Sequence, residues 1–166
     1  MDTMKRLIVT GPKQASFDDV PVPDCPPDGL LVRANVTAIS TGSEIRVYRW
    51  VPVDEAGKWI YGGVEFPDGP MENGYSMVGE VVEVGANAVG FALGDHVFCD
   101  STHKEYGVVS PDKAYKLPDN VADEHAVFMN ILNVGQIAIR NAHPTVGENV
   151  AIVGLGVIGQ IGRAHV

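Results

Sequence analysis

The sequence has little cysteine, few basic residues and no long apolar run, and each shortage excludes a class of protein. Two cysteines, Cys25 and Cys99, are too few for a disulfide framework, and they form no C-x-x-C pair. A net charge of −9 leaves no basic surface of the kind that nucleic acid or an anionic membrane requires. No run approaches the roughly 18 apolar residues of a membrane span, and the N-terminus lacks a signal-peptide pattern. We therefore expect a cytoplasmic protein that binds neither nucleic acid nor membrane.

The 166 residues begin as a series of short strand patterns separated by turn residues. The clearest strand spans 30–39, where apolar and polar residues alternate with period two. A proline-rich stretch at 18–29 should run extended, a short helix should span 44–49, and a long irregular loop should fill 51–74. Further strands are expected at residues 7–10, 77–85, 96–98, 105–109 and 114–117. Gly79, inside one of them, indicates a bulge or a close backbone approach. This spacing predicts a small barrel or sandwich.

The apolar pattern then changes its period and predicts an amphipathic helix over 123–142. Apolar residues recur at the i, i+4, i+7 and i+11 positions, namely Val127, Ile131, Val134 and Ala138. Asp123 and Glu124 suit the positive end of the helix dipole, and Arg140 suits its negative end.

A buried strand and a glycine turn follow this helix. The apolar run 150–153 leads directly into Gly154, Gly156 and Gly159, which form a G-x-G-x-x-G pattern. In a dinucleotide site these glycines allow a tight turn, a close approach of the pyrophosphate, and close packing of the next helix on the strand. The alternative is a structural glycine turn that binds no ligand.

Several segments together resemble the medium-chain dehydrogenase/reductase superfamily. Gly74-Tyr-Ser-Met-Val-Gly-Glu-Val-Val-Glu-Val-Gly85 is similar to the family's G-H-E-x-x-G-x-V-x-x-V-G pattern, and residues 89–97 are similar to its V-x-x-x-x-x-G-D-R-V pattern. Residues 106–109, 116–119 and 150–159 also fit. The resemblance implies a mostly β GroES-like barrel lobe at 1–122. It also implies a connecting helix and the first βα unit of a Rossmann (α/β doubly wound) domain at 123–166. Family chains are roughly twice this length, so a fragment is expected.

The zinc ligands of the family are missing from this sequence. The positions that resemble them hold Thr41, Tyr75-Ser76 and Asn130, which do not supply the nitrogen, sulfur or carboxylate donors that catalytic zinc requires. The lobe of four cysteines that binds structural zinc in the family is also absent, because residues 97–105 run directly between two strands. The turn Ile39-Ser-Thr-Gly-Ser-Glu44 is similar to that of zinc-less members, and we therefore expect no metal site.

Without zinc, hydroxyl groups would have to polarise the substrate. The resemblance implies catalytic roles for Ser43, Tyr75 and Thr41. Two plainer interpretations stay open, because Ser43 would also suit a helix cap and Tyr75 a half-buried core position. The resemblance further implies NAD or NADP as the cofactor. Its expected binding residues are Gly154, Gly156, Val157, Ile158, Gly159, Asn130 and Val134.

The leading hypothesis is a zinc-independent NAD(P)-dependent oxidoreductase that acts on a small-molecule carbonyl, alcohol, enone or quinone. A non-catalytic binding or assembly module, or an inactive fragment of such an enzyme, is the alternative. A third reading is an enzyme that binds a metal through other ligands. The acidic residue that would distinguish NAD from NADP should follow the glycine turn by about 20 residues and lies outside this sequence. Whether the full-length protein forms a homodimer stays open.

Overall fold

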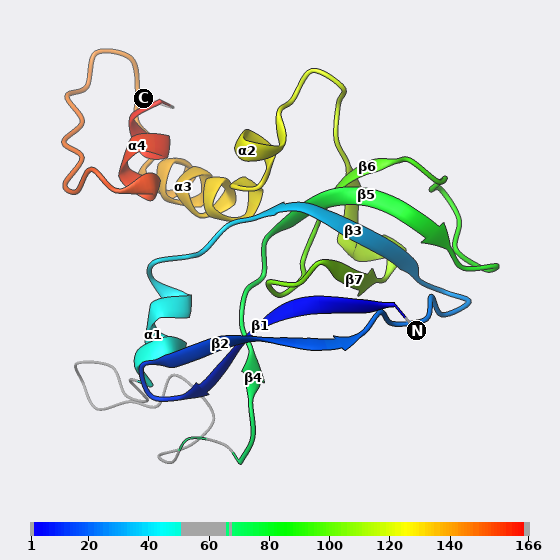
Figure 1. The fold of residues 1–166 in the computed structure, drawn as a ribbon. Helices are drawn as coiled ribbons and strands as arrows, with labels where there is room; N and C mark the ends of the chain where they lie inside the picture. Colours follow the sequence, from blue (N-terminus) through cyan, green and yellow to red (C-terminus); the bar gives the residue numbers. More distant parts are fainter. Residues whose placement is uncertain (1, 51–65, 67, 165–166) are drawn as a thin grey trace. The chain divides into compact units, whose positions relative to one another are not determined.

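The computed structural model describes residues 2–50, 66 and 68–164, so most of the loop expected at 51–74 lies outside the described residues. The chain divides into a first unit, Met1–Val127, and a second unit, Phe128–Val166. The first contains the strands and the second contains two helices (Figure 1). No helix in the described ranges is long and apolar enough to span a bilayer. The mostly β lobe expected from the sequence is confirmed.

The N-terminal strands belong to a three-stranded antiparallel sheet, whose strand order is β2-β1-β4. Its strands are β1 (Thr3–Gly11), β2 (Gln14–Pro21) and β4 (Met71–Glu72). The sequence did not predict β2, because almost all its side chains are exposed and it therefore shows no apolar alternation. Its backbone pairs with β1 from Thr3↔Pro21 to Gly11↔Gln14.

A five-stranded antiparallel sheet forms the core, in the order β7-β3-β5-β6-β8. Its strands are β3 (Leu30–Thr37), β5 (Met77–Val84), β6 (His96–Cys99), β7 (Tyr106–Val109) and β8 (Ala114–Lys116). Eight buried side chains from these strands make one cluster, namely Leu30, Val32, Met77, Val81, Val97, Cys99, Val109 and Ala114. All five strands match segments that the sequence predicted.

Gly79 lies close to the backbone of β3. A Cβ built on Gly79 would overlap the carbonyl oxygen of Arg33 on β3. The register between the two strands also shifts between Ala34 and Val36. The close backbone approach expected at Gly79 is therefore present, and it explains why a side chain is absent in the middle of a buried strand.

The helix expected over 123–142 is two helices. The short α2 (Asp123–Ala126) belongs to the first unit, and α3 (Met129–Ala142) belongs to the second. Phe128 leaves the helical region, with φ −86° and ψ 6°. One residue earlier, the carbonyl of Val127 accepts a hydrogen bond of 2.8 Å from the hydroxyl of Ser76. The 3₁₀ turn Pro111–Lys113 and α1 (Ser43–Arg49) are the other helices in the described part of the first unit.

The second unit packs α4 (Val157–Arg163) against α3. A Cβ on Gly135 of α3 would meet the side chain of Ile161, so these helices are in close contact. The expected strand at 150–153 is wrong for this structure, because the segment has no strand geometry. A β-ladder requires a partner, and the described part of the second unit contains no strand to pair with it. Val153 is consequently 99% exposed.

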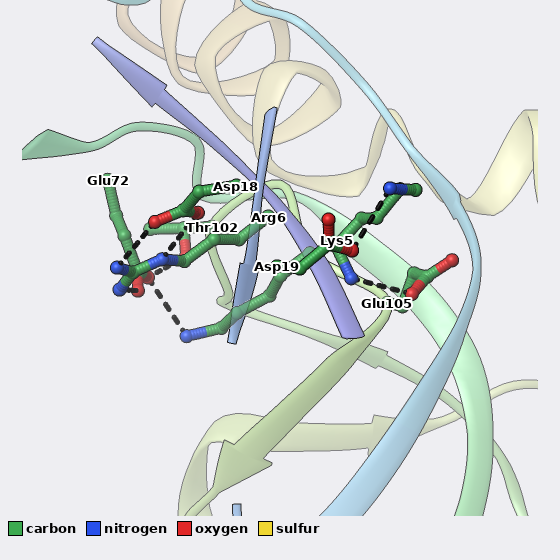
Figure 2. Close-up of polar contacts among 8 residues, drawn as sticks. Lys5, Arg6, Asp18, Asp19, Glu72, Thr102 and Glu105 are labelled. Atoms are coloured by element: carbon green, nitrogen blue, oxygen red, sulfur yellow. Dashed lines mark hydrogen bonds and ion pairs between the residues drawn. The ribbon is translucent and has the colours of Figure 1, made fainter. Parts of the chain in front are cut away.

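An ion-pair network joins the strands of the three-stranded sheet (Figure 2). Arg6 on β1 donates from Nε and Nη2 to the two carboxylate oxygens of Asp18, at 2.9 and 3.0 Å, and from Nη1 to Glu72 at 2.9 Å. Lys104 and Thr102 donate to the second carboxylate oxygen of Glu72. Burial alone would raise the pKa of Glu72, but the hydrogen bonds from Thr102, Lys104 and Arg6 outweigh it and lower the pKa to about 2.

This network should make stability depend on acidity. A carboxylate with a depressed pKa stabilises the fold above its unfolded pKa and loses that contribution as the pH falls towards its folded pKa. We therefore expect the free energy of unfolding, measured by urea denaturation, to fall between about pH 5 and pH 2. In Glu72→Gln, the loss of unfolding free energy over this pH range should be smaller by roughly 1 kcal/mol. The effect is modest because solvent screens the partly exposed carboxylate. Asp19→Asn is the control, since Asp19 pairs with Lys5 while 61% exposed. An equal flattening by both variants would contradict the prediction.

The two cysteines should differ in reactivity. Burial raises the pKa of Cys99 to about 12, and its side chain is fully buried in the core. Burial also raises the pKa of Cys25, but this residue is only half-buried. Iodoacetamide should therefore modify Cys25 slowly in the folded protein and Cys99 only after denaturation, as peptide mass spectrometry would show. Cys25→Ser should leave no thiol that reacts in the folded state, and rapid native labelling of Cys99 would refute this.

Candidate functional site

Two segments that carry predicted site residues meet at one end of the five-stranded sheet. Thr37, the last residue of β3, pairs with Met77, the first residue of β5. Beyond this pair, the amide of Ala38 donates to the carbonyl of Ser76 at 3.1 Å. The turn that follows β3 and the residues that precede β5 are therefore neighbours, although Ala38 and Ser76 are 38 positions apart in the sequence.

The predicted hydroxyl residues in these segments differ in their surroundings. Thr41 and Ser43 are exposed, Tyr75 is half-buried, and Ser76 is 1% exposed with its hydroxyl bonded to Val127. Gly42, not Ser43, is the N-cap of α1, and no side chain makes a capping hydrogen bond there. The interpretation of Ser43 as a helix cap is therefore wrong, and its hydroxyl lies at the exposed start of α1.

Sequence reasoning missed a buried pair of ionisable residues behind this turn. The Nε2 atom of His103 lies 2.6 Å from Oε2 of Glu44, and Nδ1 lies 2.9 Å from the hydroxyl of Thr37. The other carboxylate oxygen, Oε1, accepts the amide of Ser40 at 2.9 Å. Glu44 and His103 are 4% and 7% exposed. The sequence showed Glu44 only as a residue of a short helix and His103 as a lone histidine, so neither carried a spacing signal.

The predicted cofactor residues lie in the second unit. Gly154 has φ +98°, a conformation that favours glycine, and a Cβ on Gly159 would overlap the carbonyl oxygen of Gly154. Gly156 is the N-cap of α4 and has open space around it. The positive φ at Gly154, the open space at Gly156 and the close contact of Gly159 with Gly154 are thus present, although the preceding strand is not. The remaining predicted cofactor residues are the exposed Val134, Val157 and Ile158 and the half-buried Asn130.

The residues at the positions of the family's zinc ligands do not suit zinc. Threonine, tyrosine, serine and asparagine oxygens are poor ligands for this ion, and the hydroxyl of Ser76 already donates to a backbone carbonyl. Among the residues that the structure describes, no three histidine, cysteine, aspartate or glutamate side chains cluster closely enough to hold a metal.

Comparison with known proteins places this geometry in a family. The family model "Alcohol dehydrogenase GroES-like domain" matches residues 26–119. The L-threonine 3-dehydrogenase of Aeromonas hydrophila is 34% identical over 88% of this chain and 48% of its own length. The chain thus spans about half the length of the curated relatives it matches.

Solved structures show the same fold. A putative zinc-binding dehydrogenase of Sinorhizobium meliloti, bound to NADP, superposes with a TM-score of 0.78 at 20% identity, covering 98% of this chain and 52% of the other. The 2R,3R-butanediol dehydrogenase of Bacillus subtilis gives a TM-score of 0.76 at 21% identity, covering 96% and 53%. By the family match and the shared fold, the chain belongs to the alcohol dehydrogenase GroES-like family of medium-chain dehydrogenases/reductases.

Proposed function

We propose that this chain carries the substrate lobe, and the first part of the cofactor domain, of a zinc-independent NAD(P)-dependent oxidoreductase. The observation that supports the proposal is that the turn after β3, which contains Thr41 and Ser43, neighbours the segment before β5, which contains Tyr75, at one end of the five-stranded sheet. These hydroxyl residues occupy positions at or beside those where zinc members of the family place metal ligands. Proton-donating side chains would then act where a Lewis acid acts in those enzymes.

In this proposal the hydroxyl groups bind the oxygen of the substrate. The hydroxyl of Ser43 accepts a hydrogen bond from an alcohol or donates one to a carbonyl, and Tyr75 supplies a second donor from the neighbouring segment. Thr41 lines the same pocket. The nicotinamide supplies the hydride chemistry when it is bound. The exposure of Ser43 supports its role, because a group that contacts substrate has to be reachable.

The glycine turn supports the cofactor part of the proposal. Gly154, Gly156 and Gly159, with Val157 and Ile158, would hold the pyrophosphate side of NAD or NADP. Asn130 and Val134 on α3 would contact the same cofactor. The similar dehydrogenase that was solved with NADP has the same fold over 98% of this chain.

The names of the relatives narrow the substrate class. L-Threonine and 2R,3R-butanediol both carry a secondary hydroxyl group. Within the expected range of alcohols, carbonyls, enones and quinones, we favour a secondary alcohol and its ketone. The net charge of −9 accords with a small-molecule partner and not with nucleic acid.

The test uses the full-length protein after dialysis against a chelator. NADH and NADPH are titrated separately by nicotinamide fluorescence, and turnover is then followed with L-threonine and 2,3-butanediol. We expect one cofactor to bind and turnover to survive chelation. Ser43→Ala should lower kcat/KM by about 10²- to 10⁴-fold and leave the cofactor Kd unchanged.

Ser16→Ala, at an exposed position of β2, is the matched control and should change neither constant. Loss of turnover on chelation, with recovery on adding zinc, would instead favour a zinc-dependent enzyme, in line with the zinc binding named for the similar dehydrogenase. Binding of neither nucleotide would favour a non-catalytic module.

A further inference from the structure

The buried polar side chains of the described residues lie around the candidate site. They are Ser40, Glu44, Ser76 and His103. The carboxylate of Glu44 is hydrogen-bonded both to His103 and to the backbone amide of Ser40, and the carbonyl of Ser76 accepts the amide of Ala38 in the same turn. Burying an ionisable group is costly unless its hydrogen bonds are satisfied, so this arrangement tolerates few alternative geometries.

His103 contacts both segments that carry the candidate hydroxyl residues. Its Nε2 atom meets Glu44, whose carboxylate closes the turn containing Thr41 and Ser43. Its amide donates to the carbonyl of Asn73 at 3.0 Å.

On the other segment, the imidazole occupies the space in which Gly74 would carry a side chain. A Cβ there would lie 2.9 Å from the ring, and Gly74 has φ +114°. The side chain of Asn73 donates in turn to the carbonyl of Glu44 at 3.2 Å. His103 thus joins the two segments, because its imidazole is hydrogen-bonded to Glu44 and packs against Gly74 while its backbone amide is bonded to Asn73.

We propose that His103 is a positioning residue that sets the separation of Ser43 and Tyr75 through Glu44 and Asn73. The proposal rests on the proposed function for its catalytic consequence. In the neutral ring, Nε2–H donates to the Glu44 carboxylate, and Nδ1 accepts the hydroxyl of Thr37. The bond to Thr37 anchors the ring to the end of β3, and the bond to Glu44 transmits that anchor to α1.

This role predicts a specific pattern of variants in the full-length protein. His103→Phe keeps a ring but removes both hydrogen bonds, whereas His103→Gln keeps an N–H donor for Glu44. A cavity of about 410 Å³, lined by Thr37 and His103 among others, adjoins the ring and gives a changed side chain room. His125→Phe and His125→Gln, at an exposed histidine of α2, are the matched controls.

The readouts are steady-state turnover of L-threonine and 2,3-butanediol, the cofactor Kd, and hydrogen exchange of the Ser40 amide. We expect His103→Phe to lower kcat by about tenfold or more, because small misplacements of reacting groups are costly, and to leave the cofactor Kd unchanged. His103→Gln should recover most of this loss. The Ser40 amide should exchange faster in His103→Phe and return towards the native rate in His103→Gln.

An unchanged kcat and a protected Ser40 amide in His103→Phe would overturn the proposal. Equal losses in His103→Phe and His103→Gln would also overturn it, since a merely space-filling ring predicts no rescue by glutamine. If the full-length protein binds no nucleotide and turns over neither alcohol, the proposed function fails. The exchange of the Ser40 amide still decides the positioning role in that case. If His103→Phe does not fold, Thr37→Val takes its place, and an unchanged Ser40 exchange rate there would refute the role.

Discussion

The pairing of β3 with β5 is the constraint on which the rest of the first unit depends. These strands lie at the centre of the five-stranded sheet, and their ladder runs from Leu30↔Val84 to Thr37↔Met77. A shift of one residue would exchange the buried and exposed faces of both strands. It would also separate the turn after β3 from the segment before β5. The register that buries the core is therefore the same register that assembles the candidate site.

The sequence predicted the core because its signal is local. Alternation along 30–39 and the apolar run at 77–85 identify β3 and β5 without any knowledge of their neighbours. The close backbone approach at Gly79 could be predicted for the same reason, because a glycine inside a strand pattern is a local signal. The strand β2 could not be predicted from the sequence, because backbone hydrogen bonds hold it in the sheet and its side chains show no apolar pattern. The segment 150–153 shows the reverse case, in which a strand pattern has no partner strand to pair with.

Some residues of the candidate site could also be predicted from the sequence, and others could not. The glycine turn and the hydroxyl turn could be found from short motifs, since each is contiguous in the sequence. The contact between Glu44 and His103 joins residues 59 positions apart and depends on the sheet register, so no motif encodes it. It also has an energetic implication. A buried ionic or polar pair is often no more stabilising than an apolar pair of equal volume, so its presence is better explained by the geometry it enforces.

Gly42 differs from Gly79 in its tolerance of a side chain. Its backbone is right-handed helical, with φ −81° and ψ −68°, and a Cβ built on it would meet nothing within 4 Å. Gly79 tolerates no side chain, whereas position 42 imposes neither backbone strain nor a steric clash. It lies between Thr41 and Ser43, the two exposed hydroxyl residues of the turn. A single codon change there would add a side chain between these two hydroxyl residues while leaving the scaffold intact.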